Sequence, residues 1–515
     1  MNAGTISAFV VYLAAMLGIG VACYRLTSSQ SDYILGGRRL PPSVAALSAG
    51  ASDMSGWLLL GLPGAVYAGG MSQIWIAVGL VVGAYLNWQF VARRLRVYTE
   101  VARDSLTVPD YLENRFLDHS HLLRIVSAVG ILLFFTFYVS AGLVTGGLLF
   151  EKSFGLDYAV ALWIGAAVIV SYTFLGGFLA VSWTDFFQGI MMFVAIILVP
   201  VIAAVELGGF GAATARVAEA QPGFNDVFHG TTLFGIISLM AWGLGYFGQP
   251  HTLARFMAVR SSADIPTARL IGMTWMVLGL YGAIFTGYLG VAYFAGQPLE
   301  DPEAVFIRFA QALFNPWVAG FLLAAVLAAI MSTIDSQLLV CASVVSEDFY
   351  RGLIRPNAGD RELVALGRAS VVVIALVAAL LAMDPESRIL ELVAYAWAGF
   401  GAAFGPVVLL SLFSDRVTRN GAVAGLVVGA VTVVVWKQLE GGLFDMYEIV
   451  PGFILGTFAV VFVSLFDREP ALEVREEFAD AMLADAGVAV RRRAWGSDDA
   501  LGEGQAEAWR GTSTA

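Results

Sequence analysis

The chain has 515 residues, of which 58% are apolar and 13% are charged, and its net charge is −11. Soluble domains carry roughly 25% charged residues. With a mean hydropathy of +0.77, this composition excludes a secreted disulfide scaffold, a disordered chain and a nucleic-acid binder. We therefore expect a polytopic membrane protein. Its apolar runs are continuous and do not alternate over ten-residue stretches, which favours transmembrane α-helices over a β-barrel.

A window of about 19 residues predicts thirteen membrane-spanning segments along the chain. They are residues 5–24, 42–69, 73–92, 122–149, 157–175, 183–205, 231–250, 270–295, 316–346, 366–383, 389–413, 420–438 and 450–466. The second and the ninth exceed the roughly 20 residues that a straight span needs, so each must be tilted, broken or extended beyond the bilayer. We expect the first to be retained as a span and not cleaved as a signal, because no basic region precedes it.

The distribution of Lys and Arg predicts how these spans are oriented. With the N-terminus outside, the cytoplasmic connections hold 18 Lys and Arg residues and the outer connections hold five. This asymmetry predicts an outside N-terminus and a cytoplasmic C-terminus in the inner (plasma) membrane of the cell. Between spans, residues 303–314 show helical spacing of apolar residues and predict a short amphipathic helix on the outer side.

The spans and loops together suggest six parts of the chain. They are a first helix with its cytoplasmic connection (1–40), a five-helix group (41–205), an extracellular loop (206–229), a second five-helix group (230–413), two C-terminal helices (414–466) and an acidic cytoplasmic tail (467–515). In the tail, the Arg491–Arg493 cluster is interpreted as a solvated charge run, with contact to anionic lipid as the alternative. Cys23 and Cys341 lie in apolar runs, so we expect two buried free thiols.

Two of the predicted spans contain helix-breaking residues. Residues 48–57 (SAGASDMSGW) place two glycines, three serines and an aspartate in the middle of a span, and glycine and serine both weaken a helix. Residues 242–250 (WGLGYFGQP) combine three glycines with a proline, which removes a backbone hydrogen bond. Broken helices at matching positions of two oppositely oriented five-helix groups are typical of secondary transporters. The alternative is that the glycines serve helix packing and the proline makes a simple kink.

Polar residues in these spans suggest where an ion could bind. Asp53 would be costly at the bilayer centre, so it is expected to face a cavity or pathway, or to cap the second half of its broken helix. Ser332 and Thr333 offer hard oxygen ligands that suit an alkali cation, although such hydroxyls also bond back to the preceding turn. Asp185 is predicted to start the 183–205 helix, either as an N-terminal carboxylate or as an ion relay towards the cytoplasm. Asp335, one turn beyond Ser332, could share a proton or a transient cation with Asp185.

Seven segments of the sequence resemble a known family. They are residues 32–38 (DYILGGR), 46–59 (ALSAGASDMSGWLL), 61–66 (GLPGAV), 176–185 (GGFLAVSWTD), 242–251 (WGLGYFGQPH), 395–407 (YAWAGFGAAFGPV) and 418–422 (TRNGA). Over roughly residues 5–466 the chain closely resembles the sodium/solute symporter family, and within it the bacterial members that carry sodium and proline. The resemblance implies an all-α membrane protein of about thirteen helices, ten of them in a 5+5 inverted repeat of the leucine-transporter type with two broken helices.

The same resemblance implies a function and a set of site residues. The function is secondary active uptake of L-proline coupled to inward sodium movement, with sodium as a co-transported ion, no other cofactor, no enzymatic activity and no obligate protein partner. Sodium would be held by the carbonyls of Ala51, Met54 and Ala329 and the hydroxyls of Ser332 and Thr333, and Asp53 would be needed for coupling. Proline would lie near Ser55, Gly56, Trp57, Tyr138, Trp242, Tyr246 and Pro250.

Proline chemistry fits these residues. Its carboxylate suits the amide end of the broken helix around Ser55–Trp57, and its ring and ammonium group suit an aromatic wall. The segment 334–336 (IDS) departs from some relatives, which carry small uncharged residues there, so the ion ratio and proton sensitivity stay open. Two alternatives also stay open: another small solute, such as pantothenate, a sugar or a different amino acid, carried on the same scaffold, and a transporter-like membrane sensor that needs a separate partner.

Overall fold

The computed structural model describes residues 3–24, 29–383 and 389–488, and this part of the chain is all-helical apart from one isolated bridge between Leu40 and Val259. Ten of its helices are long and apolar enough to cross a membrane, and three shorter helices are also apolar. The ten coincide with ten of the predicted segments, and the shorter ones, Trp57–Gly69, Tyr158–Ser171 and Leu233–Gly248, fall in the other three. The expected polytopic helical membrane protein is therefore confirmed.

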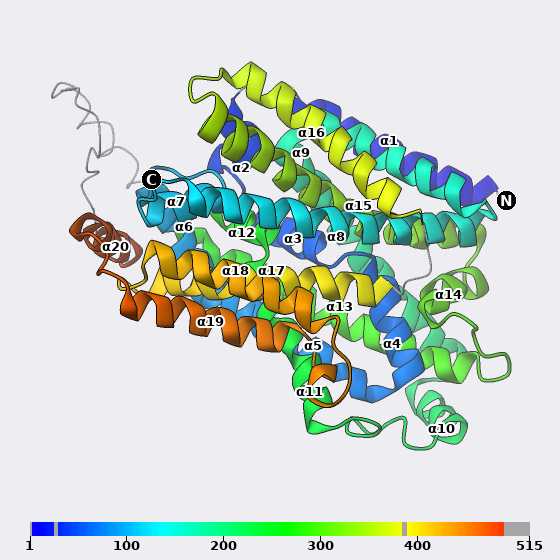
Figure 1. Ribbon diagram of the computed structural model, residues 1–515. Helices are drawn as coiled ribbons and strands as arrows, with labels where there is room; N and C mark the ends of the chain where they lie inside the picture. Colours follow the sequence, from blue (N-terminus) through cyan, green and yellow to red (C-terminus); the bar gives the residue numbers. More distant parts are fainter. Residues whose placement is uncertain (1–2, 25–28, 384–388, 489–515) are drawn as a thin grey trace.

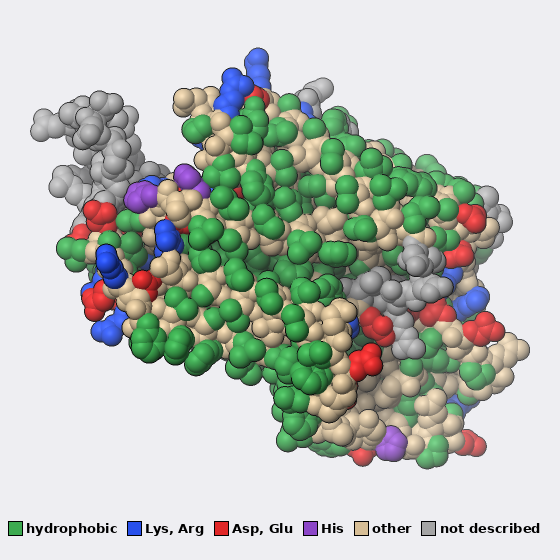
Figure 2. All heavy atoms as spheres, viewed as in Figure 1, with side chains coloured by type: hydrophobic (Ala, Val, Ile, Leu, Met, Phe, Trp, Pro, Cys, Tyr) green, Lys and Arg blue, Asp and Glu red, His purple; other side chains and the backbone are tan. Residues whose placement is uncertain are grey.

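The long helices lie side by side in one bundle (Figure 1). The α-helices are α1 (Ala3–Tyr24), α2 (Gln30–Leu35), α3 (Pro42–Asp53), α4 (Leu62–Gly69), α5 (Ile74–Leu86), α6 (Ala92–Val101), α7 (Val108–Arg115), α8 (Leu122–Phe154), α9 (Tyr158–Glu206), α10 (Phe210–Ala220), α11 (Leu233–Met240), α12 (Pro250–Ala258), α13 (Ile265–Tyr293), α14 (Val305–Leu313), α15 (Pro316–Ser343), α16 (Asp360–Leu381), α17 (Ile389–Phe413), α18 (Arg419–Trp436), α19 (Ile449–Phe466) and α20 (Leu472–Asp485). Figure 2 shows apolar side chains over the flanks of the bundle and most charged side chains towards its two ends. This distribution is the one that a lipid-embedded bundle requires.

The first predicted break is present between α3 and α4. Helix α3 ends at Asp53, and Met54 leaves helical geometry with φ −82° and ψ 69° while its N–H still bonds to the Gly50 carbonyl at 2.8 Å. The chain then makes a π-helical turn over Trp57–Gly61 before α4 begins at Leu62. Because α3 does not continue, its last carbonyl groups lack N–H donors from a following helical turn. They are therefore available to other hydrogen-bond or ion partners.

The second predicted break is also present, and it is more than a kink. After α11, the chain forms a 3₁₀ helix over Ala241–Gly248, and Gln249 is extended before α12 begins at Pro250. Proline at the first position of a helix lacks only a donor that would be unpaired anyway, so Pro250 starts α12 without disrupting it. Gly243 of the 3₁₀ segment permits close packing on α5, because a Cβ on Gly243 would lie 2.2 Å from the Gly79 carbonyl oxygen.

The boundary between two predicted spans is a bend at one residue. Segments 157–175 and 183–205 correspond to the two parts of α9 (Tyr158–Glu206), which are joined across a kink at Gly177, where φ is +60°. Glycine tolerates this conformation since it has no Cβ. The helix after the bend therefore starts before Asp185, which lies about two turns inside it. The interpretation of Asp185 as a helix N-terminal carboxylate is wrong.

Three smaller features of the sequence can be compared with the structure: the amphipathic segment, the cysteines and the tail. The amphipathic segment 303–314 forms a 3₁₀ turn followed by α14, Val305–Leu313. Cys23 and Cys341 are both buried, and neither forms a disulfide within the described residues. The first part of the predicted tail forms α20, which packs against α6 and α7 at one end of the bundle (Figure 1). The Arg491–Arg493 cluster lies outside the described residues.

Candidate functional site

The broken end of α3 contacts the middle of α15. The Ser332 hydroxyl donates to the Ala51 carbonyl at 2.8 Å and to the Ala329 carbonyl at 3.2 Å, and the Thr333 hydroxyl donates to the Ala329 carbonyl at 3.2 Å. The structure thus brings together four of the five predicted sodium ligands. The fifth, Met54, is buried at the break itself. Ser332 does bond back to its own helix, but its contact with Ala51 also joins two helices that are 281 positions apart in sequence.

Asp53 connects the two broken helices. Its side chain is 3% exposed, and the Tyr246 hydroxyl, from the 3₁₀ segment, donates a short hydrogen bond to its carboxylate. The Trp57 indole N–H donates to the Asp53 carbonyl at 3.3 Å. The other carboxylate oxygen of Asp53 has no hydrogen-bond partner among the described residues. Asp53 therefore faces the protein interior and ties the end of α3 to the second break, as a functional carboxylate at membrane depth would.

Aromatic side chains surround this junction. The rings of Trp57 and Trp242 lie 6.2 Å apart between centroids, and Tyr246 meets Trp397 edge to face at 5.1 Å. The Trp397 indole N–H donates to the Trp242 carbonyl at 2.8 Å, which fixes α17 against the 3₁₀ segment. On its other side, Trp242 packs against Tyr447 at 5.5 Å. The predicted aromatic wall is thus a continuous cluster built from four separate parts of the chain.

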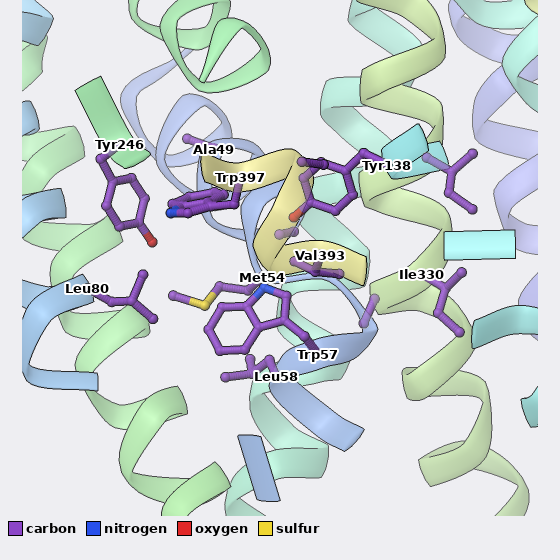
Figure 3. Close-up of a cluster of buried hydrophobic side chains, with 14 of the residues drawn as sticks. Ala49, Met54, Trp57, Leu58, Leu80, Tyr138, Tyr246, Ile330, Val393 and Trp397 are labelled. Carbon is purple, nitrogen blue, oxygen red and sulfur yellow. The ribbon is translucent and has the colours of Figure 1, made fainter. Parts of the chain in front are cut away.

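Tyr138 and Gly56 complete the cluster from α8 and from the first break. Figure 3 shows the hydroxyls of Tyr138 and Tyr246 directed towards the middle of the cluster from opposite sides. The Tyr138 side chain is 1% exposed, and its hydroxyl has no hydrogen-bond partner among the described residues. A Cβ on Gly56 would lie 2.7 Å from the Thr145 methyl group, so the backbone of the break packs directly on α8. Ser55 lies beside it, and its hydroxyl accepts from the Trp57 N–H at 3.4 Å.

Pro250 lies in a different environment from the other predicted substrate residues. It lines a cavity together with Ile131, Phe178 and Met257, whereas the cavity beside Asp53 is lined by Met54, Asn87, Trp88 and Tyr246, among others. Pro250 does not line the cavity beside Asp53. Its role in binding therefore stays a prediction.

A second polar cluster lies one turn further along α3 and α15. Asp185 is fully buried and pairs with Arg255 at 3.1 Å between Oδ2 and Nη2. The Ser48 hydroxyl donates to Asp185 at 2.7 Å, and the Ser336 hydroxyl lies 3.4 Å from the same carboxylate oxygen. Ser336 also donates to Asp335 at 3.3 Å, and Asp335 is fully buried. The structure thus brings Asp185 and Asp335 into one cluster, as their proposed cooperation requires.

The sequence analysis missed Arg255 and two of the aromatic residues. Arg255 was counted with the cytoplasmic connections, but its side chain is 0% exposed inside the bundle. Its position five residues after Pro250, in a stretch (227–259) that holds no other Lys, Arg, Asp or Glu, was the available signal. Trp397 lies in the 395–407 segment already noted, whereas Tyr447 follows a loop that carries no motif.

Comparisons with known proteins identify the family of the chain. The family model described as "Sodium:solute symporter family" matches residues 33–429. The chain belongs to the sodium/solute symporter family. This symporter is 54% identical over 479 residues to the "Sodium/proline symporter" of Escherichia coli strain K12, which covers 92% of the chain and 95% of the relative. It is also 54% identical over 468 residues to the "High-affinity proline transporter PutP" of Bacillus subtilis strain 168, covering 90% of the chain and 98% of the relative.

Solved structures show the same fold in distant symporters. A Na⁺-coupled sialic acid symporter in a substrate-bound outward-open state superposes with a TM-score of 0.79 at 19% identity, covering 91% of this chain and 99% of the other. A transporter of the nucleobase-cation-symport-1 family superposes with a TM-score of 0.51 at 16% identity, covering 88% and 99%. At these identities the likeness establishes the shared fold of this symporter, and the site has to be argued from its own residues.

Proposed function

We propose that the chain is a secondary active transporter that couples inward sodium movement to uptake of L-proline by alternating access. The observation that carries the proposal is the contact of Ser332 and Thr333 with the broken end of α3, directly beside the aromatic cluster. Relatives named as sodium/proline symporters are 54% identical over more than 90% of their length, which supports proline as the solute.

The sodium ion would lie between α3 and α15. Its ligands would be the carbonyls of Ala51, Met54 and Ala329 and the hydroxyls of Ser332 and Thr333. Ser332 now donates its proton to Ala51 at 2.8 Å, so binding requires its O–H bond to rotate away and present a lone pair. The carboxyl end of α3 carries the negative end of the helix dipole, which favours a cation there.

Proline would lie on the other side of the first break. Its carboxylate would accept from the amides near Ser55–Trp57, while its ring packs against Trp242, Tyr246 and Tyr138 and its ammonium group meets aromatic faces. Pro250 would contribute only after the second break rearranges. Because such a site is dry and enclosed, a few buried polar groups are enough to select a small zwitterion.

Asp53 would couple the two ligands. It is the last residue of α3, next to the sodium carbonyls, and it is hydrogen-bonded to Tyr246 in the aromatic wall. Sodium that orders the end of α3 therefore also orders the aromatic wall. By thermodynamic linkage, sodium and proline must each raise the affinity for the other by the same factor. Asp185 and Asp335 would influence coupling from the cluster one turn away, without touching proline.

We further propose the topology that this mechanism needs. The chain would cross the inner membrane thirteen times, with ten spans, over 41–205 and 230–413, forming two inverted five-helix repeats. The matching breaks near Asp53 and Tyr246 support the repeat, and the excess of Lys and Arg on one side supports an outside N-terminus and a cytoplasmic C-terminus.

Proteoliposomes test the function directly. Purified protein is reconstituted, and uptake of radiolabelled L-proline is followed with an inward sodium gradient and with potassium in its place. Proline accumulation above equilibrium that requires sodium is the expected result. Sodium-dependent uptake of another solute from a competitor panel, with no effect of proline, would contradict the assignment of the substrate.

A further inference from the structure

A small cavity adjoins Asp53 between α3, α5, α12 and α13. Its volume is about 20 Å³, and a site of roughly 10–15 Å³ is enough for one water molecule. Four polar side chains line the cavity, those of Asp53, Asn87, Tyr246 and Thr252, and the other lining residues are apolar or aromatic. The cavity therefore combines the size of a single small molecule with a few convergent polar groups.

Three polar atoms of these residues have no hydrogen-bond partner among the described residues. They are Asp53 Oδ1, Asn87 Oδ1 and Thr252 Oγ1, and their residues are 3%, 1% and 3% exposed. Buried polar atoms are nearly always hydrogen-bonded, either within the protein or to ordered water. The three come from α3, from a π-helical turn after α5 (Asn87–Val91) and from α12. Their meeting at one cavity points to a shared ligand.

The other hydrogen bonds of these groups show what the ligand must offer. Asn87 Nδ2 donates to the Tyr246 carbonyl at 2.9 Å, which leaves Asn87 Oδ1 as an acceptor. Asp53 Oδ2 accepts from the Tyr246 hydroxyl, so Asp53 Oδ1 is a second acceptor. The Thr252 hydroxyl is able to donate. A water molecule meets all three needs, with two donated bonds and one accepted bond, and about three bonds is the usual number for a buried water.

The start of α12 explains why Thr252 needs a partner from outside its helix. Buried threonines elsewhere in the bundle donate back to their own helix, as Thr145 does to the Ala141 carbonyl and Thr286 to the Gly282 carbonyl, both at 2.8 Å. Thr252 is the third residue of α12, which begins at Pro250 after an extended residue. No turn of α12 precedes it, so the usual bond back to the preceding turn is not made.

We propose that Asp53, Asn87 and Thr252 bind one buried water molecule, and that Asn87 and Thr252 are positioning residues that act through this water on Asp53. The effect on transport rests on the proposed coupling role of Asp53, whereas the water site does not. The water joins the end of α3 to α12 and to the turn after α5, and it holds the Asp53 carboxylate by the oxygen that Tyr246 does not contact. A carboxylate held at both oxygens has a fixed orientation, and buried polar networks of this kind keep the elements that they join in one arrangement.

The test of the water site is a structure of the wild-type protein at a resolution that shows ordered water. It is determined in sodium and again with N-methylglucamine in place of sodium. A density peak within hydrogen-bonding distance of Asp53 Oδ1, Asn87 Oδ1 and Thr252 Oγ1 in both solutions is the expected result. Absence of density there would overturn the proposal, and so would a peak that requires sodium, because that peak would be an ion.

The test of positioning is equilibrium binding of radiolabelled proline in sodium by purified variants. Thr252→Val removes the hydroxyl and should lower proline affinity about fivefold. Thr252→Ser retains the hydroxyl and should stay within about twofold of the wild type, as should the control Thr286→Val, which removes a buried hydroxyl bonded only within its own helix.

Unchanged affinity in Thr252→Val would overturn the positioning role, and so would a loss of the same size in Thr252→Ser or Thr286→Val. If Thr252→Val does not purify as a folded protein, Thr252→Ala takes its place with the same expected loss. Absence of proline binding by the wild type would instead overturn the proposed function, and the structure in the two solutions would still decide the water site.

Discussion

Replacing Ser332 with alanine should weaken sodium binding by a predictable amount. The wild-type hydroxyl contacts the Ala51 carbonyl at 2.8 Å without sodium, and it is one of five proposed ligands when sodium is bound. The variant loses an interaction with a charge worth about 1.5–3 kcal/mol in the bound state and a neutral hydrogen bond worth about 0.5–1.5 kcal/mol in the free state. The difference, about 1–1.5 kcal/mol, corresponds to a rise of about 5- to 12-fold in half-saturating sodium.

The assay is the sodium dependence of proline uptake in proteoliposomes, measured at saturating proline. Ser343→Ala is the matched control, because Ser343 is also buried on α15 but its hydroxyl only donates to the Leu339 carbonyl of its own helix, at 2.8 Å. We expect its half-saturating sodium to stay within about twofold of the wild type. Unchanged sodium dependence in Ser332→Ala would refute the assignment of Ser332 as a ligand.

Three further changes test the aromatic cluster and the tail. Tyr246→Phe removes the hydroxyl that donates to the Asp53 carboxylate and should lower the affinity for proline in the presence of sodium about tenfold. A binding assay that gives the same proline affinity for the variant and the wild type would contradict the coupling role. Gly245→Ala places a Cβ 1.9 Å from the Trp397 indole nitrogen, which should destabilise the protein by about 1–3 kcal/mol, seen as a lower Tm; an unchanged Tm would contradict this packing. Burial raises the pKa of Glu477 on α20 from 4.5 to about 7, so the docked helix favours the protonated carboxyl. The contribution of this protonation to the docking of α20 is lost as pH rises through 7. Hydrogen exchange in α20, corrected for intrinsic rates, should therefore increase between about pH 5 and pH 8 in the wild type but not in Glu477→Gln; equal changes in both proteins would contradict it.

Several features of the fold could be predicted from the sequence because they depend on neighbouring residues. Continuous apolar runs predicted the spans, and the glycines, serines and proline of 48–57 and 242–250 predicted two broken helices that the structure contains. The bend at Gly177 in α9, which separates segments 157–175 and 183–205, was not predicted. Its cause, a positive φ at Gly177 packed against Tyr33, depends on a contact with a distant residue.

Residues of the candidate site could be predicted from the sequence only where their residue type is itself unusual in a membrane span. Asp53, Ser332 and Thr333 stood out because polar groups are rare and costly at membrane depth. Arg255 was assigned to a loop, since a window of sequence cannot show that Asp185 is placed opposite it from another helix. Tyr447 was missed for a similar reason, because an aromatic residue near a span end usually marks the membrane interface.

The sequence by itself determined that this chain spans a membrane with helices, where two of those helices break and which family it belongs to. The spans and the breaks follow from hydrophobicity and backbone preference, which act over a few neighbouring residues, whereas the family follows from the similarity of its motifs. Only the tertiary structure decided that Ala51 meets Ser332 across 281 positions and that Asp185 is neutralised by Arg255. Such contacts depend on how helices pack, and packing selects among many pairings that local preferences leave equally possible.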